Sequence, residues 1–193
     1  MRCRAPGNDA LFSCSTALLR RYRRNLYYTV VRCILRWVLA ATLALVASGC
    51  DRGSEPNLIG QRAPDFSVRD SDRSVHLADI KDKVIVLNFW ATWCPPCVEE
   101  IPSLAVMQSQ LQDRVQVVAV SIDEDPEAYH RFLQEHGIQF LTVRDPQRKS
   151  PDLYGTFGWP ETYIIDRRGI IRRKFIGAVD WTNPDMLEYL KTL

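Results

Sequence analysis

The chain has 193 residues, of which 46% are apolar and 25% charged, and this composition excludes a disordered or collagen-like chain. The length allows one domain comfortably and two small ones at most. The net charge of +2 averages two unlike segments: residues 1–50 carry eight Arg and one acid, whereas residues 51–193 carry 17 basic and 22 acidic side chains. Because the second segment is mildly acidic, we do not expect nucleic acid as a partner.

An uncharged apolar run covers Trp37–Ser48 and is preceded by Arg32 and Arg36. Its 12 residues are too few to span a bilayer as a helix but suit the central region of a secretory signal. The run ends in Ala47-Ser48-Gly49-Cys50, which resembles the lipobox of bacterial lipoproteins. The resemblance implies cleavage before Cys50 and a lipid on that cysteine. An ordinary signal peptide cleaved near Gly49 and an uncleaved anchor are the alternatives.

The first 30 residues are long and rich in Arg for the start of a signal. Translation from Val30 or Val31 would give a signal of ordinary length, and a basic cytoplasmic tail is the alternative. Asp51 after a lipidated Cys50 resembles the signal that keeps lipoproteins at the inner membrane. We therefore predict a lipid-anchored protein on the periplasmic side of the inner membrane, with a soluble periplasmic protein as the alternative. Disulfides persist in that compartment.

Residues 50–60 are polar and turn-forming, which predicts a tether between a signal over residues 1–49 and a domain over residues 61–193. Two short strands, Ala63–Val68 and Ser74–Leu77, are expected around a turn at the start of this domain. Val84–Phe89 is apolar apart from Asn88, which is typical of a central strand buried on both faces. Helical spacing then relates Ile101, Leu104, Ala105, Gln108 and Leu111.

The second half of the domain continues this alternation. Val115–Ile122 reads as a second buried strand, and a helix is expected from Pro126 to Gly137 with Tyr129, Phe132 and Leu133 inward. Three later strands and a closing helix are predicted at Phe140–Val143, Thr162–Ile165, Ile171–Ile176 and from Asn183 onward. The order predicts an α/β domain whose mixed central sheet has helices on both faces.

Only two cysteines follow residue 50, and they form the motif Cys94-Pro95-Pro96-Cys97 between a buried strand and a helix. In this context a Cys-x-x-Cys pair is typical of a thiol–disulfide redox site. Proline is favoured in a first helical turn, so Cys94 is expected at the helix N-terminus, where unpaired N–H groups and the helix dipole favour a thiolate. We predict that Cys94 attacks and that Cys97, one turn inside the helix, resolves.

A zinc site and a purely structural disulfide are less favoured for this cysteine pair. A structural zinc site would need two more ligands, and His76, His130 and His136 are not grouped with the motif. A structural disulfide usually joins distant segments, because its stabilisation grows with the length of the closed loop.

Matching segments run in order through residues 60–193: Ala63–Phe66, Asn88–Cys97, Glu100 with Pro102, Gly158–Thr162 and Ile165–Gly169. In these segments the chain resembles the thioredoxin superfamily and, within it, the TlpA/ResA-type periplasmic thiol–disulfide oxidoreductases. The resemblance implies a thioredoxin-like fold with an added N-terminal β-hairpin. It also implies exchange through a Cys94–Cys97 disulfide, with Cys94 as nucleophile, Cys97 as resolving thiol and no dissociable cofactor.

The resemblance implies two further site residues. Pro160 corresponds to the cis-proline that faces the disulfide, with an ordinary turn proline as the alternative, and Trp159 before it is bulkier than the family usually carries. Asn88 stands where thioredoxin has a buried Asp, and an amide cannot take a proton. Glu100 shares a helical face with Cys97 and is therefore our candidate for proton transfer, with a solvated helix acid as the alternative.

The sequence also predicts the roles of two groups of side chains near these motifs. Trp90 and Trp93 flank the cysteines and are expected to shield them. A basic cluster is expected to be a solvated hairpin, with docking to an acidic partner as the alternative. Its members are Arg167, Arg168, Arg172, Arg173 and Lys174.

These features predict a membrane-tethered disulfide reductase that receives electrons from a membrane reductant of the DsbD type. Its substrates would be apocytochrome c thiols or a general pool of periplasmic disulfides. A redox-linked metallochaperone for copper sites is an alternative, although it would favour a wider cysteine spacing and a later His ligand. A thiol peroxidase is another, although Thr92-Trp93-Cys94 is one residue short of the Thr/Ser-x-x-Cys spacing of peroxiredoxins.

Overall fold

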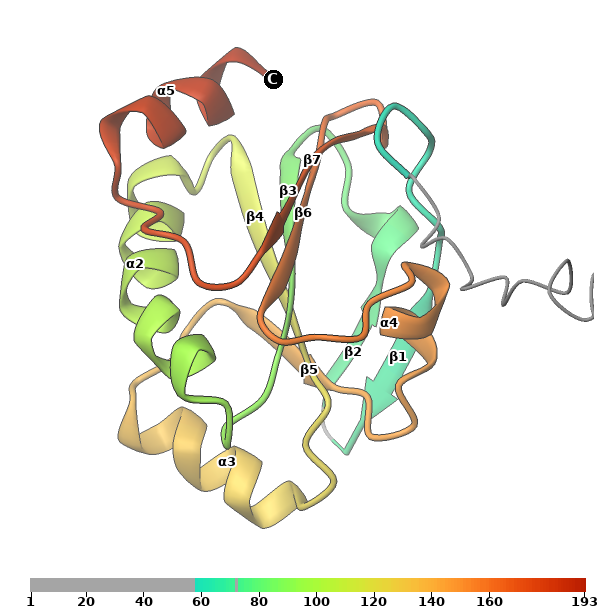
Figure 1. Cartoon of the computed structure of the whole chain (residues 1–193), viewed down its shortest axis with the longest axis vertical. Helices are drawn as coiled ribbons and strands as arrows, with labels where there is room; N and C mark the ends of the chain where they lie inside the picture. The colour runs from blue at the N-terminus through green and yellow to red at the C-terminus, as the bar shows by residue number, and fades with distance from the viewer. Residues whose placement is uncertain (1–57, 72) are drawn as a thin grey trace, which may run out of the picture. The chain divides into compact units, whose positions relative to one another are not determined.

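A computed structural model of the chain describes residues 58–71 and 73–193, so the predicted signal, Cys50 and most of the tether lie outside the described residues. The described chain contains a five-stranded sheet of order β5-β4-β3-β6-β7 (Figure 1). β3 pairs in parallel with β4, and β4 with β5, whereas β6 is antiparallel to both β3 and β7. Its strands are β3 (Val84–Trp90), β4 (Val115–Ser121), β5 (Leu141–Arg144), β6 (Glu161–Ile165) and β7 (Ile171–Ile176).

Helices cover both faces of this sheet (Figure 1). The helices α2 (Pro95–Leu111), α3 (Pro126–Glu135) and α5 (Pro184–Thr192) pack on one face. The other face carries the short α4 (Lys149–Leu153) and an antiparallel hairpin of β1 (Ser67–Asp70) and β2 (Arg73–His76), followed by a 3₁₀ turn at Leu77–Asp79. The predicted fold class, including the added N-terminal hairpin, is confirmed.

β3 is the centre of the core because all seven of its residues are buried. Alternate side chains of a strand point to opposite faces, so Val84, Val86 and Trp90 join the cluster under α2. Ile85, Leu87 and Phe89 join the cluster under the hairpin and α4. A strand buried on both faces needs apolar residues at nearly every position, which explains the sequence pattern, and Asn88 is the one polar residue of β3.

The structure corrects several local predictions. Ala63–Phe66 is not a strand, because β1 begins at Ser67. Ala105 is exposed and Met107 is buried instead, since the inward positions of α2 advance from Leu104 by three and then four residues. α4 was not predicted, because its five residues are too few to show a helical period and include Pro151. Within residues 58–71 and 73–193, no helix has the length and apolarity needed to cross a membrane.

Candidate functional site

The two cysteines lie at the junction of β3 and α2 and are joined by a disulfide with a Cα–Cα distance of 5.3 Å. Cys94 is the N-cap residue of α2, and Pro95 and Pro96 occupy its first turn, as the sequence predicts. The helix begins there because the Cys94 carbonyl accepts from the Val98 N–H at 3.1 Å. Cys94 is 5% exposed and Cys97 is 1% exposed, so Cys94 is the more accessible residue of the pair.

The turn before Cys94 is held by a buried carboxylate that sequence reasoning missed. Asp123 accepts from the Thr92 N–H at 3.0 Å and from the Thr92 hydroxyl at 2.7 Å, and the Ser121 hydroxyl donates to it at 2.5 Å. The helix α3 begins at Pro126, where the sequence predicts it, and its N-cap is Asp125, so Asp123 is free to hold the turn. Parallel pairing of Trp90 with Ser121 places the residues that follow both strands side by side, and this register is visible only in the structure.

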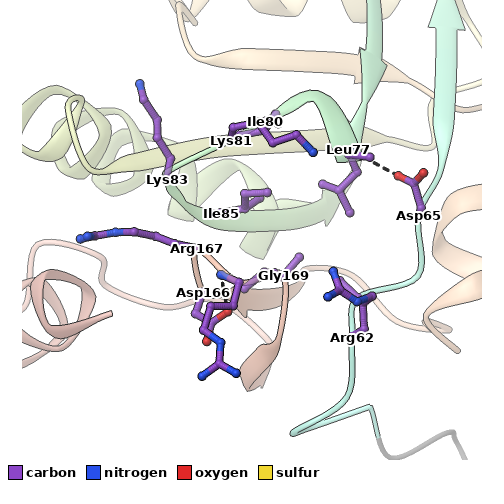
Figure 2. Close-up of a pocket in the computed structure, with 14 residues that line it drawn as sticks. Arg62, Asp65, Leu77, Ile80, Lys81, Lys83, Ile85, Asp166, Arg167 and Gly169 are labelled. Carbon is purple, nitrogen blue, oxygen red and sulfur yellow. Dashed lines mark hydrogen bonds between the residues drawn. The ribbon is translucent and has the colours of Figure 1, made fainter.

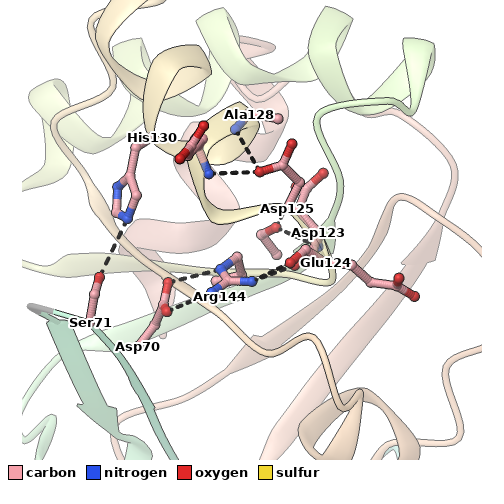
Figure 3. A network of polar contacts seen from close by, with 10 residues as sticks. Asp70, Ser71, Asp123, Glu124, Asp125, Ala128, His130 and Arg144 are labelled. Carbon is pink, nitrogen blue, oxygen red and sulfur yellow. Dashed lines mark hydrogen bonds and ion pairs between the residues drawn. The ribbon is translucent and has the colours of Figure 1, made fainter.

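Arg144 connects the β1–β2 hairpin to this same corner (Figure 3). Its Nε and Nη2 donate to the two carboxylate oxygens of Asp70 at 3.1 and 3.0 Å. Its Nη1 donates to the main-chain carbonyls of Asp123 and Glu124 at 3.3 and 2.7 Å. The Arg144 and Asp70 side chains are only 11% and 10% exposed, so this is a nearly buried, bidentate ion pair behind the active-site turn.

Glu100 is buried, 3% exposed, on the inner face of α2 that also carries Cys97. The solvated-acid alternative is therefore wrong. Burial raises the pKa of Glu100 to about 7, although hydrogen bonds from Trp181, the Val179 backbone and Asn88 oppose the shift. The Trp181 indole donates at 2.5 Å and the Asn88 amide at 3.3 Å.

Asn88 continues this polar network across the sheet, because its amide also donates to the Thr162 hydroxyl at 2.9 Å. Sequence reasoning identified Asn88 and Glu100 but missed Trp181. Trp181 lies 81 residues from Glu100, and no local pattern marks such a contact. The network joins β3, β6, α2 and the segment before α5 around one carboxyl group.

The Trp159–Pro160 peptide bond is cis. Phe89 pairs with Glu161 in the antiparallel register, so Pro160 lies at the end of the sheet where β3 leads into the cysteine motif. The Pro160 carbonyl already accepts from the Gly177 N–H at 2.9 Å. Trp159 is half-buried, with the Arg148 guanidinium 5.2 Å from its ring centroid.

The two tryptophans of the motif differ in environment. Trp90 is 1% exposed and packs between Tyr129 and Phe132 of α3, with ring centroids 6.2 and 5.6 Å away. Trp93 is 62% exposed, because it lies on the open turn that Asp123 holds. Phe157, which precedes the cis-proline and was not predicted as a site residue, is 70% exposed.

No three His, Cys, Asp or Glu side chains of the described residues form a group that could hold a metal ion. A disulfide sits at a helix N-terminus, with a buried carboxyl group of raised pKa one helical turn beyond the inner cysteine.

Comparisons with known proteins agree with this site. Residues 59–174 match the AhpC/TSA family. The thiol-disulfide oxidoreductase ResA of Bacillus anthracis is 30% identical over 172 residues, which cover 88% of this chain and 96% of that protein. ResA of Bacillus subtilis (strain 168) is 30% identical over 163 residues, covering 83% of this chain and 89% of that protein.

Solved structures give the same result. A DsbF homologue from Corynebacterium diphtheriae superposes with a TM-score of 0.60 at 30% identity, covering 74% of this chain and 95% of that one. A thiol:disulfide interchange protein of the thioredoxin family from Chlorobium tepidum TLS gives 0.59 at 26% identity, covering 68% and 94%. The chain therefore belongs to the AhpC/TSA family of thioredoxin-like proteins and is a thiol–disulfide oxidoreductase similar to ResA.

Proposed function

We propose that this oxidoreductase works as a reductase of protein disulfides outside the cytoplasm and is held at the membrane by a lipid on Cys50. The observation that carries the proposed exchange chemistry is the presence of the buried Cys97 and a buried acid, Glu100, on one face of α2, since such an acid can take up the Cys97 proton in the reducing direction and return it in the oxidising one. A reductase must deprotonate its second thiol in every turnover, and a buried carboxyl group on that face provides a base.

The cycle begins with the reduced enzyme. The Cys94 thiolate, stabilised by the N-terminus of α2, attacks one sulfur of the substrate disulfide and releases the other as a thiol. Cys97 then loses its proton and attacks the Cys94 sulfur, which releases the second substrate thiol. Two electrons and two protons pass to the substrate, and the enzyme is left with its Cys94–Cys97 disulfide.

Glu100 is proposed to accept the proton that leaves Cys97. A general base is most effective when its pKa lies near the working pH, and burial holds the pKa of Glu100 at about 7. Asn88, which cannot take a proton, instead donates a hydrogen bond that fixes the carboxyl group. Glu99 on the neighbouring position is exposed and is not proposed to take part.

The partner polypeptide is proposed to bind across the cis-Pro160 turn. Proline has no N–H, and the Pro160 carbonyl already accepts from Gly177, so the backbone of Trp159 is the better candidate for pairing with a partner strand. The exposed rings of Trp93 and Phe157 offer apolar contact surface for such a partner.

The lipid on Cys50 would place the enzyme on the periplasmic side of the inner membrane, where a membrane reductant of the DsbD type would return electrons to the Cys94–Cys97 disulfide. The apolar run Trp37–Ser48 and the Ala47-Ser48-Gly49-Cys50 ending support this location. A disulfide of apocytochrome c, which the enzyme would reduce to thiols, and a general pool of protein disulfides are the proposed substrates.

The decisive measurement is the reduction potential of the Cys94–Cys97 pair against glutathione. A value near roughly −270 mV supports the reductase, whereas a value near about −120 mV indicates an oxidase and overturns the proposed direction. Insulin reduction and peroxide consumption are measured side by side with Cys94→Ser as the control. Rapid peroxide consumption without insulin reduction would favour the thiol peroxidase.

A further inference from the structure

A pocket of about 350 Å³ opens at the end of the sheet opposite the cysteines. Figure 2 shows the residues that line it. Its apolar lining includes Ile85 and Ile165, which pair with each other where β3 begins and β6 ends. Cys94 follows the other end of β3, so the full length of that seven-residue strand separates the pocket from the disulfide.

Basic side chains predominate around this pocket. Five cations line it: Arg62, Lys81, Lys83, Arg167 and Arg168. The two carboxylates in the lining have other partners. Asp166 lies 2.6 Å from the Arg172 guanidinium, and Asp65 lies 3.0 Å from the His76 imidazole.

Most of these cations have no anionic partner among the described residues. Lys83 donates to the Gln112 carbonyl at 2.8 Å. The other four cations are exposed: Arg62, Lys81, Arg167 and Arg168. Within residues 58–71 and 73–193, no carboxylate forms an ion pair with any of them. Unpaired like charges repel, and an anion from outside the domain would relieve that repulsion.

The basic side chains of the β6–β7 hairpin fall into two groups, those on the strands, which have partners, and those in the turn. Arg172 pairs with Asp166, Lys174 lies 3.2 Å from Glu161, and Arg173 stacks 3.8 Å from the Tyr189 ring centroid. Arg167 and Arg168 lie in the turn itself, whose shape is fixed by two N–H groups donating to Asp166 at 2.9 Å. The turn therefore presents two guanidinium groups from a rigid loop.

The chain enters the domain at this same end. The Gly60 N–H donates to the Ile171 carbonyl at 2.8 Å, and the Ala63 N–H donates to the Gly169 carbonyl at 2.9 Å. A lipid on Cys50 would be joined to Gly60 by ten residues, which span at most roughly 35 Å. The basic pocket is thus on the end of the domain that such a tether holds nearest the bilayer.

We propose that this pocket and its rim bind the phosphate groups of anionic lipid headgroups and so dock the domain on the membrane with its disulfide facing outward. The proposal rests on the membrane location proposed above. The end that carries the disulfide has exposed acids at Glu99, Glu124 and Glu127. An anionic surface attracts the basic end within a Debye length of about 8 Å at physiological salt, whereas the disulfide end, where these acids are accompanied by Arg148 beside Trp159, offers no comparable attraction.

The test measures sedimentation of the full chain with phosphatidylcholine vesicles that contain or lack phosphatidylglycerol, in a Cys50→Ser background so that no lipid anchor contributes. Lys81→Glu/Arg167→Glu/Arg168→Glu should weaken binding to the anionic vesicles about tenfold or more. The matched control is Arg69→Glu/Arg131→Glu/Lys149→Glu, which makes the same change in net charge at exposed positions outside the pocket lining. It should change binding less than about twofold, because surface attraction decays within a Debye length.

The basic segment 1–50 is identical in all these proteins, so it does not contribute to the difference between them. If both triple variants lost the same amount of vesicle binding, net charge alone would explain the loss, and the proposal would be overturned. Failure of the parent chain to prefer anionic vesicles would also overturn it, and would leave an acidic protein as the partner of this end. Full competition by millimolar inorganic phosphate would indicate a site for free anions instead of a membrane surface.

This outcome is separable from the proposed reductase activity. Insulin is a soluble substrate, so the Lys81/Arg167/Arg168 variant should reduce it at the parent rate. Loss of insulin reduction in the parent chain would overturn the reductase proposal and leave the vesicle result valid.

Discussion

The indole Nε1 of Trp181 donates a 2.5 Å hydrogen bond to Oε1 of Glu100, and both side chains are buried. A residue just before α5 thus completes the surroundings of an acid on α2. Burial disfavours the charged carboxylate, while the indole and the Asn88 amide favour it, and the balance leaves the pKa of Glu100 at about 7. Small changes in these surroundings therefore change the charge of Glu100 near neutral pH.

Glu100→Gln should slow disulfide exchange, because it removes the proposed proton acceptor from the face of α2 that carries Cys97. A proton-transfer role contributes about 10²–10⁴-fold in a step that it fully limits. The measurement is the pH dependence of insulin reduction, and the rise near pH 7 should be absent in the variant. An identical pH–rate profile in both proteins would remove Glu100 from the mechanism.

The same substitution should change how stability depends on pH. A raised pKa means that the folded state keeps a proton that the unfolded state, with a pKa near 4.5, has released. The free energy of unfolding of the parent protein should therefore fall as pH rises from about 4.5 to about 7 and then stay level with respect to this group. Glu100→Gln lacks this effect, so its stability relative to the parent should improve across that window by on the order of 3 kcal/mol. Urea unfolding at both ends of the window measures the difference.

Trp181→Phe should raise the pKa of Glu100 further, because the carboxylate loses its shortest hydrogen bond. The midpoint of the pH–rate profile should move to higher pH, with a stability loss of about 1–3 kcal/mol. The matched control is Phe175→Leu, which removes the ring 5.7 Å from Trp181 and leaves the hydrogen bond to Glu100 in place. If the control moves the midpoint equally, packing and not the indole donor sets the pKa.

Arg144→Met should destabilise the domain by about 3–5 kcal/mol, because it leaves the nearly buried Asp70 carboxylate without its partner. Asp70→Leu/Arg144→Met removes both charges and should be the more stable of the two variants in urea unfolding. The loss of the Arg144 bonds to the Asp123 and Glu124 carbonyls should persist in both. A double variant no more stable than Arg144→Met would show that the unpaired carboxylate is not the source of the loss.

The sequence predicted the parts of this molecule that follow from local patterns. The apolar run of β3, the start of α2 at Cys94 and the start of α5 after Asn183 each depend on neighbours within a few residues. Trp181 and Asp123 were missed because their partners lie 81 and 31 residues away. Such contacts depend on how strands and helices pack, which a single sequence does not display.

Cys50→Ser should abolish lipid labelling and leave unprocessed precursor, because the lipobox-like ending at Ala47-Ser48-Gly49-Cys50 provides the modified residue. Labelling with a radioactive fatty acid, followed by fractionation, measures both effects. Cys33→Ser is the control, since that cysteine precedes the apolar run and should not affect labelling. Continued processing to a fully soluble product would reject the lipid anchor.

Cys97→Ser should trap the physiological partner as a mixed disulfide. Exchange proceeds through attack by a thiolate, and Cys97 is placed one helical turn inside α2 to break the bond that Cys94 forms. The substitution leaves the helix N-terminus intact, so Cys94 should still attack. The adduct should therefore form, resolve slowly and appear on a non-reducing gel.

The matched variant is Cys94→Ser, which should give no adduct, because Cys97 is 1% exposed and lies on the core side of α2. A partner disulfide therefore does not reach Cys97 unless the helix opens. The identity of the trapped protein distinguishes apocytochrome c from a general pool of disulfides. Adducts with Cys94→Ser and none with Cys97→Ser would mean that the nucleophile and the resolving thiol are assigned in the wrong order.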